Sequence, residues 1–134
     1  MATDRIPPGP IPDFCRVLVL IKNFGRSSMH ITSFCIEKRV CAVLPVAHEY
    51  RNIDNNWQPW LAPHDALWFV PSDALIAVHL NAGERADIQT GRAIFWVYGY
   101  ITYLNVLGKS LTHKFLYKWD LTKGFVRENR AGYS

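Results

Sequence analysis

The sequence predicts an all-β protein folded as an antiparallel β-sandwich, and two observations carry this prediction. Short apolar stretches rich in β-branched and aromatic residues are separated by clusters of Gly, Pro, Asn and Asp. No long stretch repeats its apolar residues with the period of an amphipathic helix. A β-barrel is the alternative architecture for strands of this kind.

The size of the chain fits a single domain. It has 134 residues, of which 49% are apolar and 19% are charged. A chain of this length buries enough apolar surface to fold without a metal or disulfides. We expect an extended, proline-rich leader over residues 1–12, the sandwich domain over residues 13–126, and a C-terminal tail over residues 127–134. We expect no cofactor.

The first half of the chain predicts two strands and a long connection. Cys15–Lys22 is a β-branched run too short for a helix, which indicates a buried strand. Asn23 and Gly25 tolerate a positive φ and predict a turn. Met29–Val43 carries the second strand. We interpret Pro45–Ala66, with its prolines and asparagines, as an irregular connection with anchored tryptophans.

The middle of the chain leaves two interpretations open. Leu67–Val70 is predicted to be a short strand, and Leu75–Leu80 a second one beyond Pro71. Apolar residues at alternate positions favour a strand for Leu75–Leu80, while a short helix capped by Ser72 is the alternative. The polar stretch Gly83–Thr90 has room for one helical turn.

The last third of the chain predicts a hairpin. Ala93–Tyr103 and Lys109–Trp119 are expected to be antiparallel strands, and Asn105 and Gly108 suit the tight connection between them. The second strand alternates apolar with polar residues and should be half-buried. The first strand is apolar on both faces, so we expect it to be central or covered on its second face. Gly99 destabilises that strand, so we expect a local reason for it, such as a bulge or a large neighbour like Trp96 or Trp119 lying across it.

One face of the first hairpin strand is a candidate interface. Trp96, Tyr98 and Tyr100 share this face because they stand at alternate positions. If they are exposed, they form an apolar patch that predicts a protein partner or self-association into a homo-oligomer. The alternative is that a further strand or the Pro45–Ala66 connection covers them.

The long connection is a candidate ligand-binding site. It holds Arg51, Trp57, Trp60 and His64 together with several asparagines. Tryptophans beside amide side chains suit a sugar or an extended peptide, and loops on a rigid sandwich commonly carry recognition. The alternative is that Trp57 and Trp60 plug the end of the core.

Nothing in the sequence forms a known catalytic motif, and we expect a non-enzymatic interaction or binding module. The competing hypothesis is a small-ligand-binding protein or an enzyme that uses His48, His64 and Asp65 beside the long connection. His113 lies on an apolar face and is expected to be a hydrogen-bonded core histidine.

The basic residues concentrate near the C-terminus. Residues 109–130 hold six basic and two acidic side chains, in a chain whose net charge is +4. Lys114 and Lys118 are expected on one face of their strand, with Phe115 and Tyr117 on the other. Binding of nucleic acid requires basic side chains close to aromatic rings on which bases can stack. Here the two kinds of side chain lie on opposite faces of the strand, so we do not expect nucleic-acid binding. We prefer the interpretation that these lysines are solvent-exposed and keep an edge of the sheet soluble.

The three cysteines Cys15, Cys35 and Cys41 form an odd set with no Cys-x-x-Cys motif. We expect buried thiols here, not a disulfide framework or a zinc site. The N-terminus does not follow the plan of a signal peptide. We therefore expect a reduced, cytoplasmic setting, or a periplasmic one if an upstream anchor is missing from this chain. Contact with a membrane is expected only through such an anchor.

Two segments resemble a group of uncharacterised bacterial proteins. Val97–Gly108 is similar to their C-terminal signature, roughly G-x-I-x-Y-x-D-x-F-G, and Lys22–Met29 resembles their upstream motif, N-x-G-(K/R)-(T/S)-P-A. Those proteins often carry the domain after an N-terminal transmembrane helix. The resemblance implies an immunoglobulin-like β-sandwich of about seven strands. Asn105 stands where the family has Asp, and Leu107 replaces its aromatic residue. The resemblance implies architecture and no activity.

Overall fold

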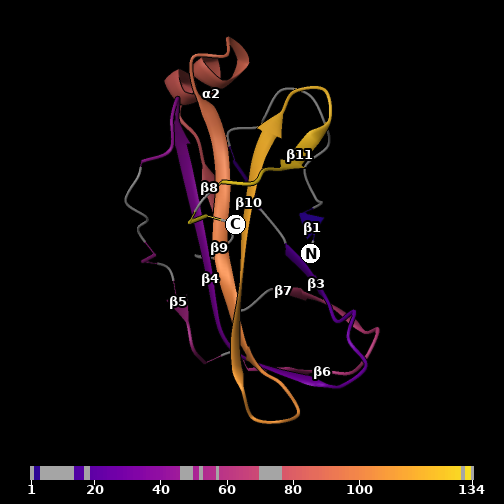
Figure 1. Ribbon diagram of the computed structural model, residues 1–134. Helices are drawn as coiled ribbons and strands as arrows, with labels where there is room; N and C mark the ends of the chain where they lie inside the picture. Colours follow the sequence, from indigo (N-terminus) through magenta and orange to yellow (C-terminus); the bar gives the residue numbers. More distant parts are fainter. Residues whose placement is uncertain are drawn as a thin grey trace.

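The protein is mostly β, with antiparallel sheets, as Figure 1 shows for the computed structural model. The residues that the structure describes are 2–3, 14–16, 19–45, 50–51, 53–56, 58–69, 77–130 and 132–133.

A large antiparallel sheet runs the length of the molecule (Figure 1). Its strand order is β11-β10-β9-β4-β5, and β6 pairs with another part of β4. The strand bounds are β4 Met29–Cys41, β5 Ile53–Asp54, β6 Trp60–Leu61, β9 Ile94–Leu104, β10 Ser110–Asp120 and β11 Gly124–Arg127. The predicted hairpin is therefore confirmed as β9 and β10, and β9 is central, between β4 and β10.

The β9–β10 connection is built by Asn105 in the way that its residue type predicts. Its Oδ1 accepts hydrogen bonds from the backbone N–H groups of Leu107 and Lys109, both at 2.9 Å. Gly108 takes a positive φ of 76°. Gly25, by contrast, does not take a positive φ. The chain turns there because Asn23 Oδ1 accepts from the Gly25 N–H at 2.9 Å.

Two smaller sheets complete the described strands. One has the order β1-β3-β7, with β1 at Ala2–Thr3, β3 at Val19–Lys22 and β7 at Ala66–Phe69. The other pairs β2, Phe14–Arg16, with β8, Ala77–His79. The predicted single strand over Cys15–Lys22 is therefore wrong. Its two ends belong to different sheets, because β2 pairs with β8 while β3 pairs with β7.

The helix α2, Ala82–Gln89, replaces the single helical turn expected in this region. Asn81 caps it: its side chain accepts from the Glu84 N–H at 2.8 Å, and Glu84 Oε1 accepts from the Asn81 N–H at 3.2 Å. This reciprocal capping box satisfies two backbone donors that the first turn leaves free. The side chain of Ile88 in this helix is buried and belongs to the main apolar core, so it attaches the helix to the rest of the domain.

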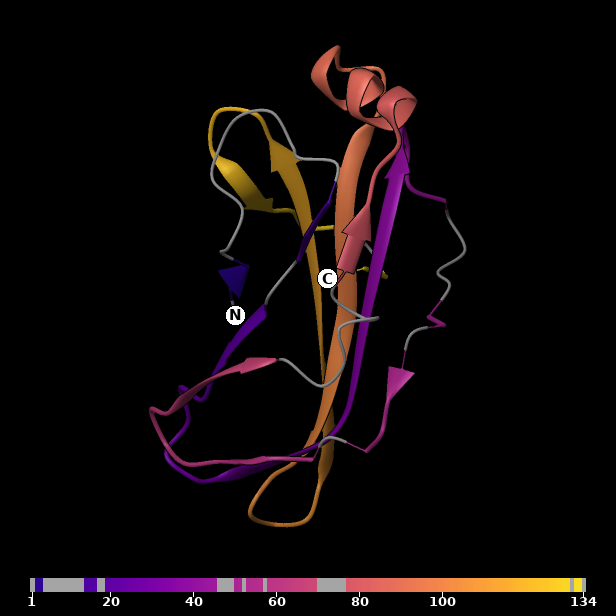
Figure 2. The ribbon, with the colours of Figure 1, turned by 180° about the vertical axis from the view of Figure 1, so that it is seen from behind.

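The main core lies between the large sheet and β3. Val19 and Ile21 of β3 pack against the inner face of the large sheet, to which β4, β9 and β10 contribute. The fully buried members with the largest side chains are Phe34, Phe95, Phe115, Ile21, Ile31, Ile36 and Val19. Figures 1 and 2 show β3 and β7 set off to one side of the large sheet.

A second apolar cluster covers the other face of β9. It contains Leu44, Trp96, Tyr98, Leu116 and Tyr133, all of them buried. Both faces of β9 are therefore buried, as its sequence predicts. The predicted alternation of buried and exposed residues along β10 is wrong. Residues 112–114 are all exposed and residues 115–117 are all buried, because the second apolar cluster covers the other face of the strand there.

Gly99 is needed for close packing of two backbones. A Cβ at this position would overlap the carbonyl oxygen of Cys35 in β4 and stand 3.0 Å from Phe115 Cζ. The predicted large neighbour is present, but it is Phe115 and not Trp96 or Trp119, and the closest contact is main chain. The neighbour is main chain from one adjacent strand and a phenyl ring from the other.

The segment expected to be a C-terminal tail is packed where the structure describes it. Arg127 ends β11, and Glu128 Oε1 lies 2.8 Å from Lys118 Nζ in β10. Tyr133 is buried, and its hydroxyl donates to the Pro45 carbonyl at 2.6 Å. Residues 127–130 and 132–133 thus continue the fold beyond the expected boundary at residue 126.

Cys35 and Cys41 carry free thiols. Burial, and secondarily the negative charge of Glu37, raise the pKa of Cys35 to about 12. That thiol is therefore protonated at neutral pH. Within the described ranges, no helix combines the length and apolar character that a membrane crossing requires.

Candidate functional site

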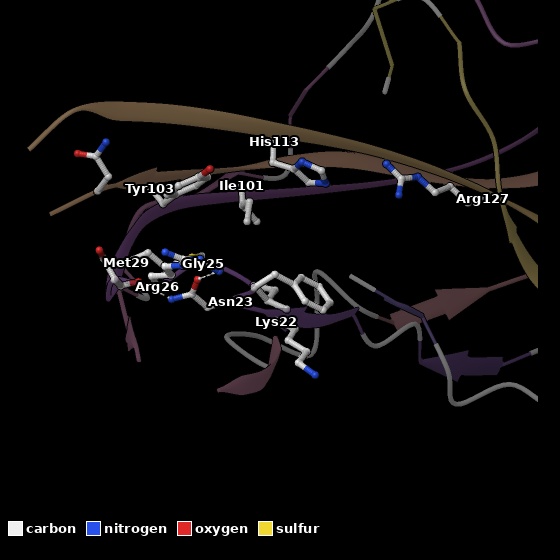
Figure 3. A pocket seen from close by; sticks show the side chains of 13 residues that line it. Lys22, Asn23, Gly25, Arg26, Met29, Ile101, Tyr103, His113 and Arg127 are labelled. Atoms are coloured by element: carbon white, nitrogen blue, oxygen red, sulfur yellow. Dashed lines mark hydrogen bonds between the residues drawn. The ribbon is translucent and has the colours of Figure 1, made fainter. Parts of the chain in front are cut away.

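A cavity of about 530 Å³ lies between the β3–β4 turn and the large sheet (Figure 3). Its volume falls within the range of about 300–1,000 Å³ that is usual for small-molecule sites. The described residues that line it are Ile21, Lys22, Asn23, Phe24, Gly25, Arg26, Ser27, Met29, Ile101, Tyr103, Asn105, His113 and Arg127.

Asn23 fixes the wall that the β3–β4 turn provides. Its side chain is buried, and its Nδ2 donates to the carbonyls of Ser27 at 2.8 Å and Leu61 at 3.0 Å. Its backbone N–H donates to the Asp65 carbonyl at 3.0 Å. Asn23 therefore ties the turn to β6 through its side chain and to the segment that follows β6 through its backbone.

The opposite wall comes from the regular pairing of the large sheet. Ile101 and Tyr103 are two residues apart in β9 and face the same side. His113 in β10 is the cross-strand partner of Ile101, so its ring joins the same wall. Arg127 arrives through β11, whose register places it opposite Tyr117 of β10.

The cavity is cationic among the residues that the structure describes. Lys22, Arg26 and Arg127 line it beside His113, and the described lining contains no carboxylate. In Figure 3 the Arg127 guanidinium points towards the His113 ring, whereas the Lys22 amino group turns away. Arg127 therefore faces the cavity beside His113, and Arg26 lines it from the β3–β4 turn.

His113 differs from its sequence-based expectation. It is exposed at the cavity and is not a core histidine, because β10 is covered only from Phe115 onward. Partial burial of the ring, and then the positive charge of Arg127, lower the pKa of His113 below 6.5. The imidazole is therefore mainly neutral at pH 7, and a bound anion would favour its protonated form.

The cavity offers hydrogen-bond donors beside apolar surface. The donors are guanidinium, imidazole and amide groups, and the apolar surface comes from Ile21, Met29, Ile101 and Phe24. Such a lining suits an anion attached to an apolar body. It does not suit a divalent metal, which requires several carboxylate, thiolate or imidazole ligands. Across the described residues, no three His, Cys, Asp or Glu side chains gather in a metal-binding arrangement.

The predicted ligand-site residues are dispersed. Arg51 is exposed beside the middle of β4, where its backbone N–H donates to Glu37. Trp60 pairs with His30 at the start of β4. Seven residues of extended chain separate His30 from Glu37, which corresponds to about 23 Å. The structure therefore does not bring Arg51 and Trp60 together.

Trp60 and His64 belong to the segment that borders the cavity without lining it. Trp60 is 70% exposed, and its ring stacks on His30 with centroids 4.4 Å apart. Trp60 is therefore not a plug of the core. His64 is exposed, has a φ of 66°, and donates its backbone N–H to the Asn23 carbonyl at 2.8 Å. Trp57 and His48 lie outside the described residues.

The candidate interface residues are covered by the chain itself. Trp96 is 1% exposed and Tyr98 is 3% exposed. Tyr50 packs edge-on against Tyr98 and Tyr100, with centroids 6.0 Å and 5.1 Å away, and Tyr133 packs edge-on against Tyr98 at 5.1 Å. The exposed aromatic patch that the interface hypothesis required does not form, because these rings occupy it.

Sequence reasoning missed the basic residues of the cavity. Arg26 lies inside one of the two segments that carry the family resemblance, so a signal for it was present. Arg127 was placed in a tail because β11 has only four residues. The available signal was the turn before it: Asp120 Oδ1 accepts from the N–H groups of Thr122 and Lys123, and Gly124 has a φ of 80°.

Comparison with known proteins gives no relative to name. No family model matches the chain, and neither the curated proteins nor the solved structures contain a significant match.

Proposed function

We propose that this chain is a non-enzymatic binding domain that holds a small anion with an apolar portion in the cavity between the β3–β4 turn and the large sheet. The observation that carries this proposal is the lining itself. Arg26, Arg127 and His113 line a space of about 530 Å³, together with Lys22 and with apolar, amide and hydroxyl side chains. The described lining carries positive charge and no carboxylate, so the cavity favours binding of an anion.

Three features support binding over catalysis. The described lining supplies donors, and a general base oriented by a carboxylate is absent from it. His113 is mainly neutral and shares the site with arginines, which serve as fixed cations. The turn that forms one wall is held rigidly by Asn23, and a pre-formed wall favours tight binding.

The two segments that carry the family resemblance meet at this cavity. Lys22–Met29 supplies the turn, and Val97–Gly108 supplies the wall of β9 and the start of its connection. On that resemblance we also propose that the fold is an immunoglobulin-like sandwich of about seven strands. The antiparallel pairing and the core shared by β3 and the large sheet support it. An experimental structure in which β3 lies away from that sheet would contradict it.

A pair of fluorescent probes tests the binding proposal. Anilinonaphthalene sulfonate carries an anion on an apolar body, and N-phenylnaphthylamine has the same rings without the sulfonate. We expect the sulfonate probe to bind the folded protein at least about tenfold more tightly than the neutral one, which corresponds to about 1.4 kcal/mol.

Charge-reversal variants locate the site. Arg127→Glu should weaken binding of the sulfonate probe by about tenfold or more and change binding of the neutral probe little. Arg92→Glu is the matched control, because Arg92 is an exposed arginine that lies near Asp87 of α2 and does not line the cavity. Equal affinities for the two probes, or equal losses in both variants, would refute the proposal.

A further inference from the structure

We propose that one end of the molecule docks on the surface of a lipid bilayer that contains anionic lipids. We call this end the loop end. It comprises residues 23–28 between β3 and β4, residues 60–66 around β6, and residues 105–109 between β9 and β10. Figures 1 and 2 show all three at the same end of the molecule, opposite α2.

Specific contacts hold these three segments next to one another. The Asn23 N–H donates to Asp65 O at 3.0 Å, and the His64 N–H donates to Asn23 O at 2.8 Å. His30 is the cross-strand partner of both Trp60 in β6 and Leu104 in β9. Residues 23–28 and 60–66 are therefore in direct contact, and the start of β4 connects residues 60–66 to the β9–β10 connection.

Large apolar side chains project from each segment of the loop end. Phe24 is 72% exposed, Trp60 is 70%, Val106 is 72% and Leu107 is 87%. Val106 and Leu107 occupy the tip of a turn whose geometry Asn105 already fixes, so the fold does not require apolar residues there. Exposed apolar residues gathered in this way mark an interaction surface. Tryptophan is especially suited to the boundary between lipid and water.

The charge of the loop end identifies the kind of surface that it fits. Lys22, Arg26 and Lys109 stand in these segments or beside them, against one acidic residue, Asp65. The Lys22 ammonium lies 5.1 Å from the centre of the Phe24 ring, so a cation and an exposed apolar side chain are presented together. Apolar side chains that insert between lipids, with cations that contact anionic headgroups, are the usual combination for interfacial binding.

The shape of the loop end supports a bilayer over a protein partner. The β9–β10 connection projects beyond the neighbouring segments in both views (Figures 1 and 2). A bilayer accepts projecting side chains without a matching pocket, whereas a protein partner must supply one. The loop end shares Lys22, Phe24 and Arg26 with the lining of the cavity, but Trp60, Val106 and Leu107 do not line it. Variants at Val106 and Leu107 therefore test the bilayer inference separately from the proposed cavity ligand.

Co-sedimentation with vesicles tests the inference on the full chain. The probes are vesicles of phosphatidylcholine alone and vesicles of phosphatidylcholine mixed with phosphatidylglycerol. We expect the wild type to bind the mixed vesicles about tenfold more tightly, and high salt to reduce this binding. The double variant V106D/L107D should lose about tenfold in binding to the mixed vesicles.

Two controls keep the result specific. Val43→Asp introduces one of the same acidic side chains at a similarly exposed apolar residue, 74% exposed, beyond the far end of β4, and should bind like the wild type. The Arg127→Glu variant should bind the sulfonate probe weakly but bind the mixed vesicles like the wild type. This result would distinguish the vesicle inference from the proposed cavity ligand. Failure of the wild type to bind mixed vesicles, or equal loss in Val43→Asp, would overturn the inference. So would a dimer in vesicle-free solution that V106D/L107D dissociates, because a second copy would then be the partner.

Discussion

Asn23 concentrates several hydrogen bonds in one buried side chain. Its Nδ2 donates to two backbone carbonyls, and its Oδ1 accepts from one backbone N–H. We expect Asn23→Ala to lower the free energy of unfolding by about 2–3 kcal/mol, because at least one buried polar group loses its partner. Urea unfolding measures this change. Asn56→Ala, at an exposed asparagine, should change stability by less than about 0.5 kcal/mol, and equal effects would contradict the role given to Asn23.

Gly99 gives a second prediction at the scale of one residue. An added methyl group must displace the main chain of β4 at Cys35, which cannot rotate away as a side chain can. We therefore expect Gly99→Ala to destabilise the protein by about 3 kcal/mol or more. Gly83→Ala in α2 is the control. Its Cβ would stand 3.3 Å from Asn81 Oδ1, and alanine favours a helix, so its effect should stay within about 1 kcal/mol. Thermal unfolding of both variants compares them.

The helix α2 depends on its first turn. The capping box between Asn81 and Glu84 supplies partners for two N–H groups. Asn81→Ala should cost about 1 kcal/mol, and Asn81→Asp should cost much less because it can still accept from the Glu84 N–H. Denaturant unfolding followed by circular dichroism measures both. A cost for the aspartate variant as large as for alanine would show that the cap is not the cause.

The β10–β11 hairpin predicts how stability changes with pH. Hydrogen bonds from Thr122 and Lys123 lower the pKa of Asp120, and the Lys118 ammonium lowers the pKa of Glu128. The unfolded chain therefore binds protons more readily than the folded one at acidic pH. The stability that these two carboxylates contribute is fully present above their ordinary pKa values of 3.8 and 4.5. It should be lost as the pH falls below these values and through the lower pKa values of the folded state. Urea midpoints measured between neutral and acidic pH should fall less steeply in Asp120→Asn than in the wild type.

Elements with long, regular patterns were predictable from the sequence. The alternation in Lys109–Trp119 and the turn residue Asn105 identified β9 and β10 because a hairpin is a local structure. The run Cys15–Lys22 was misread because apolar periodicity does not say which partner a strand chooses. The helix α2 was underestimated although Asn81 and Glu84 have the spacing of a capping box.

At the scale of the whole molecule, the cavity depends on long-range packing. It brings together residues of β3, β9, β10 and β11 that are as far apart in sequence as Ile21 and Arg127. The burial of Trp96 and Tyr98 likewise depends on Tyr133, which returns to the sheet from the end of the chain. Sequence patterns over a few residues do not contain this information, so the sequence indicated aromatic faces and loops but not which of them are covered.

Titration of the His113 ring by NMR, with and without the sulfonate probe, tests the cationic cavity most directly. In the free protein we expect a pKa below 6.5, because the ring is partly buried near Arg127. A bound anion stabilises the imidazolium, so saturating anilinonaphthalene sulfonate should raise the pKa of His113, and N-phenylnaphthylamine should leave it unchanged. A pKa that does not move with either bound probe would contradict the account.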